Sequence, residues 1–306
     1  MSGVAFVFLH DRRQKCTLRA DFGMRKIIVN ADDLGADEAR NEGIFEAIRA
    51  GVVTSASILP NGPALGHALE RVRSGGCEGV SFAVHLNLSE GRPLAEGLTR
   101  LAGPDGKFLG KAGAHRLLAG AGDAFLGAEI ARETTLQIGK LLDEGIAVTH
   151  IDGHQHVHVF PAALSAVTET AKAFGISRMR IPDETDLPEG GALEAKRLEE
   201  SRRFAFLGRE ARRRLAAAGI ASSDHFRGLA LKGRLDLERL VELAGSLPEG
   251  TTELMVHPGR VPVRNAFSAF SSADRERELE ALLHPRFRLA LRAAGVMLVS
   301  FREIDS

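Results

Sequence analysis

A repeated alternation of short apolar runs with amphipathic segments restricts the fold of this chain more than any other feature of its sequence. The short runs are rich in β-branched residues and predict strands, whereas the amphipathic segments, several of them closed by glycine, predict helices. We expect strands at 26–30, 52–59, 80–84, 147–152, 178–181, 252–256 and 296–301. We expect helices at 37–50, 63–73, 128–144, 161–174, 192–219, 235–247, 274–283 and 286–294. This order predicts an α/β protein with a parallel sheet, and both a barrel and an open doubly wound sheet are compatible with it.

The organisation of the chain favours one domain. No Pro- or Ser-rich linker and no shift in composition divides it, and the glycine-rich segment 90–113 is expected to form a long loop beside the functional site. The first 23 residues contain only a short apolar run and lack both a positive leader and a small-residue cleavage site. Since Met24 opens the stretch "MRKIIVN", we expect 1–23 to be a poorly packed N-terminal extension and 24–306 to form the functional domain.

The charge balance excludes several classes of partner. The 306 residues contain 40 basic and 40 acidic side chains, so the formal net charge is zero. The sequence therefore lacks the excess of positive charge that is typical of proteins that bind nucleic acid or an anionic membrane. No run approaches the roughly 18 apolar residues of a membrane span. Cys16 and Cys77 fit neither a disulfide framework nor a zinc-site spacing. We therefore predict a cytoplasmic protein with a small-molecule partner, and neither nucleic acid nor membrane as a partner.

Acidic residues and histidines stand at the ends of four predicted strands. "NADD" supplies Asp32 and Asp33, "VHLNL" supplies His85, "MVHPG" supplies His257, and "HIDGHQHVH" is rich in histidine. Because the carboxyl ends of parallel strands meet at one edge of the sheet, these motifs predict a shared site. The sequence contains no GxGxxG or Walker loop, and the acidic "ADDLG" would repel a phosphate, which disfavours a dinucleotide site.

The combination of carboxylates and imidazoles indicates a metal site. One carboxylate and two imidazoles from separate strand ends can hold a divalent cation and leave positions for water and substrate. Adjacent aspartates can divide the work, because one can bind the cation while the other takes a proton from water. In the histidine-rich segment His154, His156 and His158 are each two residues apart, so an extended chain would direct all three to the same side. Local geometry therefore leaves open which of them is a ligand. Four isolated histidines are expected to be surface or structural residues: His67, His115, His225 and His284.

In this order the motifs resemble the YdjC-like carbohydrate deacetylases, the family of chito-oligosaccharide deacetylases. The resemblance runs from about Arg25 to Ile304 and rests on "IVNADDLG", "VHLNLSEGRPL", "THIDGHQHVHVFP" and "ELMVHPG". Leu34 and Gln155 depart from the family pattern without touching a predicted ligand, and the match over 184–250 is weak.

The resemblance implies a distorted (β/α) barrel and the removal of an N-acetyl group from an amino sugar. It implies three metal ligands: Asp33, His85 and His154. It further implies that Asp32 is the general base, that His257 is a general acid or polarising group, and that Arg180 in "RMRIP" lies near the substrate. The family suggests Mg²⁺, whereas one aspartate with two histidines suits zinc or another transition metal better.

Other functions remain open at this point. They are hydrolysis of another ester, amide or phosphoester, a non-haem iron oxygenase, which also uses two histidines and a carboxylate, and a catalytically silent sugar-binding protein. All 16 aromatic residues are phenylalanine, so stacking platforms for long polysaccharides are scarce and a small acetylated carbohydrate is the favoured substrate. A homodimer is the default expectation for such an enzyme.

Overall fold

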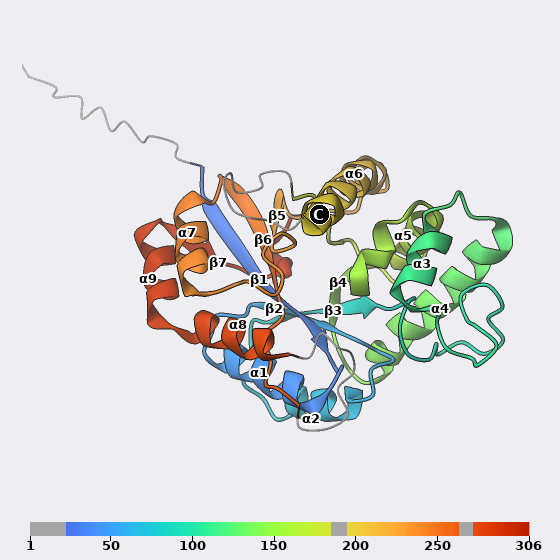
Figure 1. Cartoon of the computed structure of the whole chain (residues 1–306), viewed down its shortest axis with the longest axis horizontal. Coiled ribbons are helices and arrows are strands. Elements are labelled where there is room, and N and C mark those ends of the chain that lie inside the picture. The colour runs from blue at the N-terminus through green and yellow to red at the C-terminus, as the bar shows by residue number, and fades with distance from the viewer. Residues whose placement is uncertain (1–22, 185–194, 263–271, 306) are drawn as a thin grey trace, which may run out of the picture.

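The structure is a computed structural model that describes residues 23–184, 195–262 and 272–305. Except for Gly23, the predicted N-terminal extension lies outside these described residues. A seven-stranded parallel sheet forms the centre of the molecule, in the order β4-β3-β2-β1-β6-β5 with β7 also paired to β1 (Figure 1). The strands are β1 (Arg25–Leu34), β2 (Ser55–Ile58), β3 (Ser81–Leu86), β4 (Val148–Gly153), β5 (His225–Arg227), β6 (Gly250–Val256) and β7 (Val296–Leu298).

β1 is the central strand and is paired along both of its edges. Residues 25–31 pair with β6, residues 25–27 with β7, and the carboxyl-terminal part of the strand with β2. From Ile27 onward every residue of β1 is buried. Strands of a parallel sheet that are covered on both faces read as continuous apolar runs, and "IIV" followed by Ala31 fits this rule. The residues that end β1 are therefore held by a rigid, fully paired strand.

The sheet curls, and isolated parallel bridges span the side between β4 and β5. Ile151 of β4 pairs with Met179, and Arg178 pairs with Ala221, which precedes β5. These bridges connect the two ends of the strand order, so the sheet forms a distorted barrel. The α/β class and the distorted (β/α) barrel of a single domain are thus confirmed, and an open doubly wound sheet is not what forms.

Helices cover the outside of the curled sheet. They are α1 (Glu38–Arg49), α2 (Leu65–Arg73), α3 (Gly110–Leu118), α4 (Ala124–Asp143), α5 (Pro161–Ala173), α6 (Ala195–Ala217), α7 (Leu237–Ser246), α8 (Ala273–Leu283) and α9 (Pro285–Ala293), with the 3₁₀ segments η1 (His154–Val159) and η2 (Phe301–Glu303). Figure 1 shows α7 and α9 at the left of the curled sheet, α8, α1 and α2 below it, and α3, α4 and α5 at the right. In the described residues, no helix is long and apolar enough to cross a membrane.

Three short elements differ from the sequence prediction. β5 has three residues and was not predicted, and α3 begins at Gly110, inside the segment expected to be a loop. Residues 178–181 were predicted as a strand but contribute only isolated bridges. Short elements bury little surface of their own, so tertiary pairing rather than local periodicity decides them. Residues 192–194 of the predicted helix 192–219 lie outside the described residues.

Candidate metal centre

The two aspartates at the end of β1 face one site because the strand is irregular there. The pairing of β1 with β2 shifts its register between Ala31 and Leu34, and Asp33 has a left-handed backbone with φ 69°. In a regular strand successive side chains point to opposite faces, and a bulge redirects one of them. Both carboxylates are buried as a result, each only 2% exposed.

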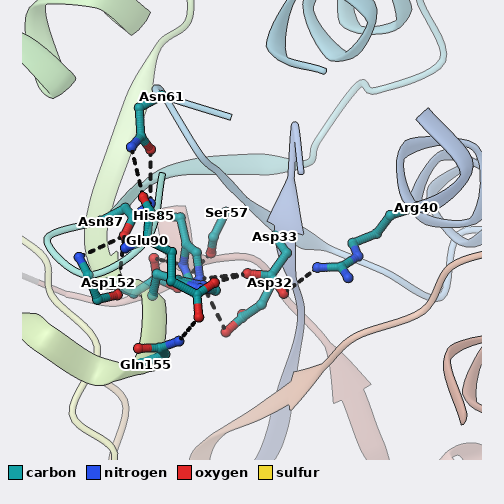
Figure 2. A network of polar contacts seen from close by, with 12 residues as sticks. Asp32, Asp33, Arg40, Ser57, Asn61, His85, Asn87, Glu90, Asp152 and Gln155 are labelled. Carbon is teal, nitrogen blue, oxygen red and sulfur yellow. Dashed lines mark hydrogen bonds and ion pairs between the residues drawn. The ribbon is translucent and has the colours of Figure 1, made fainter. Parts of the chain in front are cut away.

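Two imidazoles, from the end of β3 and from the segment after β4, converge on one carboxylate oxygen at the end of β1. Nδ1 of His154 lies 2.8 Å from Oδ1 of Asp33, and Nε2 of His85 lies 3.3 Å from the same oxygen. The other oxygen of Asp33, Oδ2, accepts a hydrogen bond of 2.6 Å from Nη1 of Arg40 on α1. Figure 2 shows Arg40 approaching Asp33 from the side opposite to His85 and Glu90. Arg40 thereby fixes the carboxylate and leaves Oδ1 directed at the two imidazoles.

A second carboxylate supports each of the two imidazoles from behind. Nδ1 of His85 donates to Oδ1 of Asp152 at 2.8 Å, and Nε2 of His154 lies 3.2 Å from Oε2 of Glu90. Oε1 of Glu90 in turn accepts from Nε2 of Gln155 at 2.7 Å (Figure 2). A carboxylate on the far nitrogen selects the tautomer and raises the basicity of the near nitrogen. The nitrogens that face Asp33 are therefore prepared to act as electron-pair donors.

The electrostatics of this cluster favour positive charge between the ligands. Burial alone would lower the pKa of His85, but the carboxylates of Asp152 and Asp32 raise it to about 10. Burial likewise opposes the protonation of His154, yet Asp33 and Glu90 raise the pKa of this imidazole. Burial would raise the pKa of Asp33, but His154 and Arg40 hold it well below its usual range. Without a metal ion the cluster takes up protons, so a cation is the charge that this site accommodates.

The donor atoms fit a divalent cation. Those of Asp33, His85 and His154 all lie within 4.8 Å of one another. Ligand bonds of about 2.0–2.2 Å place neighbouring ligand atoms roughly 3 Å apart, close to the separations seen around Oδ1 of Asp33. Asp32, His85 and Asp152 form an overlapping group. In this second group Asp152 already accepts from His85 Nδ1, and Arg180 pairs with both aspartates.

Asp32 is held by a buried guanidinium. Nη1 and Nη2 of Arg180 donate to its two oxygens, each at 2.7 Å, and Nδ2 of Asn30 donates to Oδ1 at 2.8 Å. Nε of Arg180 donates to Glu253 at 2.7 Å, and Nη1 also lies 3.0 Å from Asp152. Arg180 is 0% exposed, so its guanidinium is buried together with the carboxylates that it contacts. Oδ2 of Asp32 lies 4.0 Å from Nε2 of His85, which brings this oxygen to the edge of the centre.

His257 follows β6 at the same edge of the sheet. β1 and β6 are paired in parallel as far as Ala31 and Val256, and Asp32 and His257 are the residues that follow these two partners in the chain. His257 is 4% exposed. The structure thus brings the residue to the edge of the sheet where the predicted metal ligands lie.

The histidine-rich segment divides between the site and the core. Among its histidines, His154 is the one whose ring contacts Asp33. His156 packs against the rings of Phe204 and Phe226, with centroids 4.7 and 6.0 Å away. Nε2 of His158 donates to the backbone carbonyl of Arg180 at 3.0 Å. The sequence spacing could not distinguish these three histidines, whereas their contacts in the structure differ.

The backbone is strained at the same place. Among the described residues, the non-glycine residues with positive φ are Asp33, Gln155 and His156, the last two with φ 55° and 58°. Such conformations cost free energy of order 1–3 kcal/mol each and persist where the surrounding structure enforces them. Gln155 and His156 turn the chain immediately after His154. The strain is therefore confined to the two segments that carry Asp33 and His154.

Several charged partners of the site were not predicted from the sequence. Arg40 stands in an amphipathic helix, and Glu90 in a segment predicted as a loop. Glu253 lies inside β6, where an acidic residue in an apolar strand is the available signal. Asp152 stands in the motif "HIDGHQHVH" at a predicted strand end, which is a signal for a site residue but not for a partner of His85. Their roles depend on contacts between distant segments.

Comparisons with known proteins agree with the motifs. The profile of the family described as YdjC-like protein matches residues 26–293. A carbohydrate deacetylase of Mus musculus is 36% identical, covering 92% of this chain and 95% of the relative. A chitooligosaccharide deacetylase of Escherichia fergusonii is 33% identical, covering 92% and 99%. Among solved structures, an Enterococcus faecalis V583 protein provisionally described as a cellobiose-phosphate cleavage protein matches with a TM-score of 0.67 and 23% identity, over 91% of this chain and 98% of its own.

Proposed function

Since the chain belongs to the YdjC-like protein family, we propose that it is a metal-dependent carbohydrate deacetylase, a hydrolase that cleaves the N-acetyl amide of a small acetylated amino sugar. The observation that carries this proposal is the convergence of His85 and His154 on one oxygen of Asp33, in a family whose named relatives are carbohydrate deacetylases. We propose that Asp32, whose Oδ2 lies 4.0 Å from Nε2 of His85, and His257, which follows the neighbouring strand β6, supply the acid–base groups that an amide hydrolysis requires.

The cation would be held by Asp33, His85 and His154. When bound, it supplies Lewis-acid chemistry to the acetyl carbonyl and to the attacking water. Two imidazoles and one carboxylate favour zinc or another transition metal, whereas the family resemblance points to Mg²⁺. We propose one divalent cation and leave the choice between these ions to metal analysis.

Asp32 would be the general base. Its Oδ2 is the oxygen at the edge of the centre, and it takes a proton from the water that attacks the acetyl carbon. Arg180 holds both oxygens of this carboxylate, and its guanidinium also pairs with the carboxylates of Asp152 and Glu253. We therefore propose that Arg180 orients the base, which replaces the contact with the substrate suggested by the resemblance.

His257 would complete the reaction as the general acid. The bond from the acetyl carbon to the water oxygen forms, and the bond from the same carbon to the sugar nitrogen breaks. Because an amide nitrogen leaves only when protonated, the imidazole of His257 gives it a proton, and the products are acetate and the free amine. The scarcity of aromatic platforms favours a monosaccharide or a short oligosaccharide as the substrate.

Acetate release from a panel of N-acetylated monosaccharides and oligosaccharides tests this proposal. The wild type should release acetate, chelation should abolish release, and a restored divalent cation should recover it. Asp32→Asn and His257→Ala should each lower kcat by roughly 10²–10⁴-fold. His67→Gln, at a half-buried position on α2 that contacts Glu42 and Asn41 of α1, is the matched control and should retain wild-type activity. Full activity of Asp32→Asn would remove the proposed base.

The assembly and location of the enzyme are proposed separately. We propose a homodimer, the commonest state of such enzymes, acting in the cytoplasm. Light scattering of the purified full chain should give twice the mass of the 32.8 kDa protomer. A monomer at micromolar concentration would contradict the first part of this proposal.

A further inference from the structure

The loop that carries His257 is clasped by two charged side chains of α8. Oε1 of Glu278 accepts a hydrogen bond of 2.6 Å from the backbone N–H of His257. Nη1 of Arg275 donates to the backbone carbonyl of the same residue at 2.9 Å. The two side chains thus occupy both backbone polar groups of His257.

Both side chains are deeply buried, and their placement follows from the helix. Arg275 is 0% and Glu278 2% exposed. They stand three residues apart, so they project from the same face of α8. The distance between Nη1 of Arg275 and Oε2 of Glu278 is 3.6 Å, longer than either contact with His257. Since burying an ion pair carries a large desolvation penalty, a pair directed at the backbone of one residue indicates a task at that residue.

The same loop is held from its other side by α1. The backbone N–H of Arg260 donates to the carbonyl of Ala39 at 3.0 Å. A Cβ on Gly43 would come within 2.5 Å of Cα of Gly259, so α1 and the loop touch backbone to backbone. α1 also carries Arg40, which donates to Asp33. A continuous framework therefore connects the loop of His257 to a predicted metal ligand.

We propose that Arg275 and Glu278 are positioning residues that hold the backbone of His257 so that its imidazole reaches the leaving amine. This inference rests on the proposed deacetylase function. Both side chains act through the polypeptide backbone of His257, which each of them contacts. Displacement of a catalytic group by about 1 Å can lower a rate roughly 10²-fold, which is the size of effect expected here.

A double-mutant cycle tests this role in the full chain. Glu278→Leu removes the acceptor and should lower kcat about 10²-fold with little change in KM. In a His257→Ala background the same substitution should lower kcat by less than about threefold, because the residue through which it acts is gone. The alkaline limb of the kcat–pH profile reports the ionisation of the general acid, His257. This limb should shift in the Glu278→Leu single variant.

Matched variants separate positioning from general damage. Glu278→Gln keeps an oxygen acceptor for the N–H of His257 and should restore most of the activity lost in Glu278→Leu. Glu280→Ala, at an exposed position on the same helix, should leave kcat unchanged. If Glu278→Leu does not fold, Arg275→Met takes its place in the same cycle with His257→Ala.

The outcomes distinguish this inference from the proposed function. A wild type that releases no acetate contradicts the function itself. The positioning role is overturned if the wild type is active and Glu278→Leu lowers kcat by the same factor with and without His257. It is also overturned if Glu278→Gln is inactive. Non-additive losses together with rescue by Glu278→Gln support it.

Discussion

Two sets of histidines from the same part of the barrel have opposite electrostatic surroundings. His85 and His154 face carboxylates, and the pKa values of both are raised. His150, His156 and His158 are buried as well, but desolvation lowers the pKa of each, to about 3 for His150 and about 4 for His158. His150 stacks on Phe301 with ring centroids 3.5 Å apart. The identity of the residue does not decide its role, because the neighbouring groups determine whether the ring favours a charge.

The largest expected effect separates His154 from His156. His154→Ala should lower metal affinity by more than the roughly 10–100-fold that follows loss of an outer partner, because it removes a proposed ligand. His156→Ala should keep the metal content but lower the free energy of unfolding by roughly 2–4 kcal/mol, since it leaves a cavity between phenylalanine rings. Metal content by mass spectrometry and chemical unfolding measure the two effects. If His156→Ala lost its metal while His154→Ala kept it, the proposed difference between a ligand and a core histidine would be wrong.

A smaller effect is expected at the carboxylate behind His85. Asp152→Asn should lower metal affinity by roughly 10–100-fold, because the amide no longer holds the Nδ1 proton as a carboxylate does. Calorimetric titration of the metal-free protein measures this affinity. Glu90→Gln, which alters the weaker contact behind His154, provides a comparison and should lose less. An unchanged affinity in Asp152→Asn would show that this carboxylate does not support the ligand.

The pH dependence of stability should differ between the two sets. The folded-state pKa of His85 is raised from 6.5 to about 10, so its contribution is complete below pH 6.5 and is lost as the pH rises toward 10. The pKa of His150 is lowered from 6.5 to about 3, so its contribution is complete above pH 6.5 and is lost on acidification. Thermal unfolding of the metal-free protein between pH 5 and pH 10 should show both limbs.

Substitutions and added metal test which histidine causes each limb of the stability–pH profile. His85→Asn should flatten the alkaline limb, and His150→Phe the acidic one. Saturating metal should weaken the alkaline loss, because a cation binds the neutral imidazole and replaces the proton. An alkaline limb that is identical in the wild type and His85→Asn would contradict the assignment to this histidine.

The smallest effect is expected outside both sets. His67 on α2 lies 3.3 Å from a carboxylate oxygen of Glu42, and both side chains are partly exposed. Ion pairs at such positions contribute about 0–1 kcal/mol, so His67→Gln should change the free energy of unfolding by less than about 1 kcal/mol. Metal affinity should stay at the wild-type value, and a measured loss would mean that the centre extends further than its described contacts.

The long elements of the fold could be predicted because their periodicity is local. The predicted helix 161–174 corresponds to α5, and the predicted strand 252–256 lies within β6. β5 and the bridges at 178–179 escaped prediction because their pairing partners are distant in the sequence. The family and the barrel were predicted from the motifs. The identity of the cation and the roles of the site residues stay predictions.

The sequence by itself determined that Asp32, Asp33, His85 and the histidine-rich segment would meet, because parallel strands bring their carboxyl ends to one edge of a sheet. The tertiary structure alone decided which atoms face one another. A bulge in β1 turns Asp33 toward His85, and two residues with positive φ turn the chain after His154. It also decided that Arg180 pairs with Asp32 and that α8 clasps His257. The physical reason is that orientation depends on packing and hydrogen bonds between segments that are far apart in the chain.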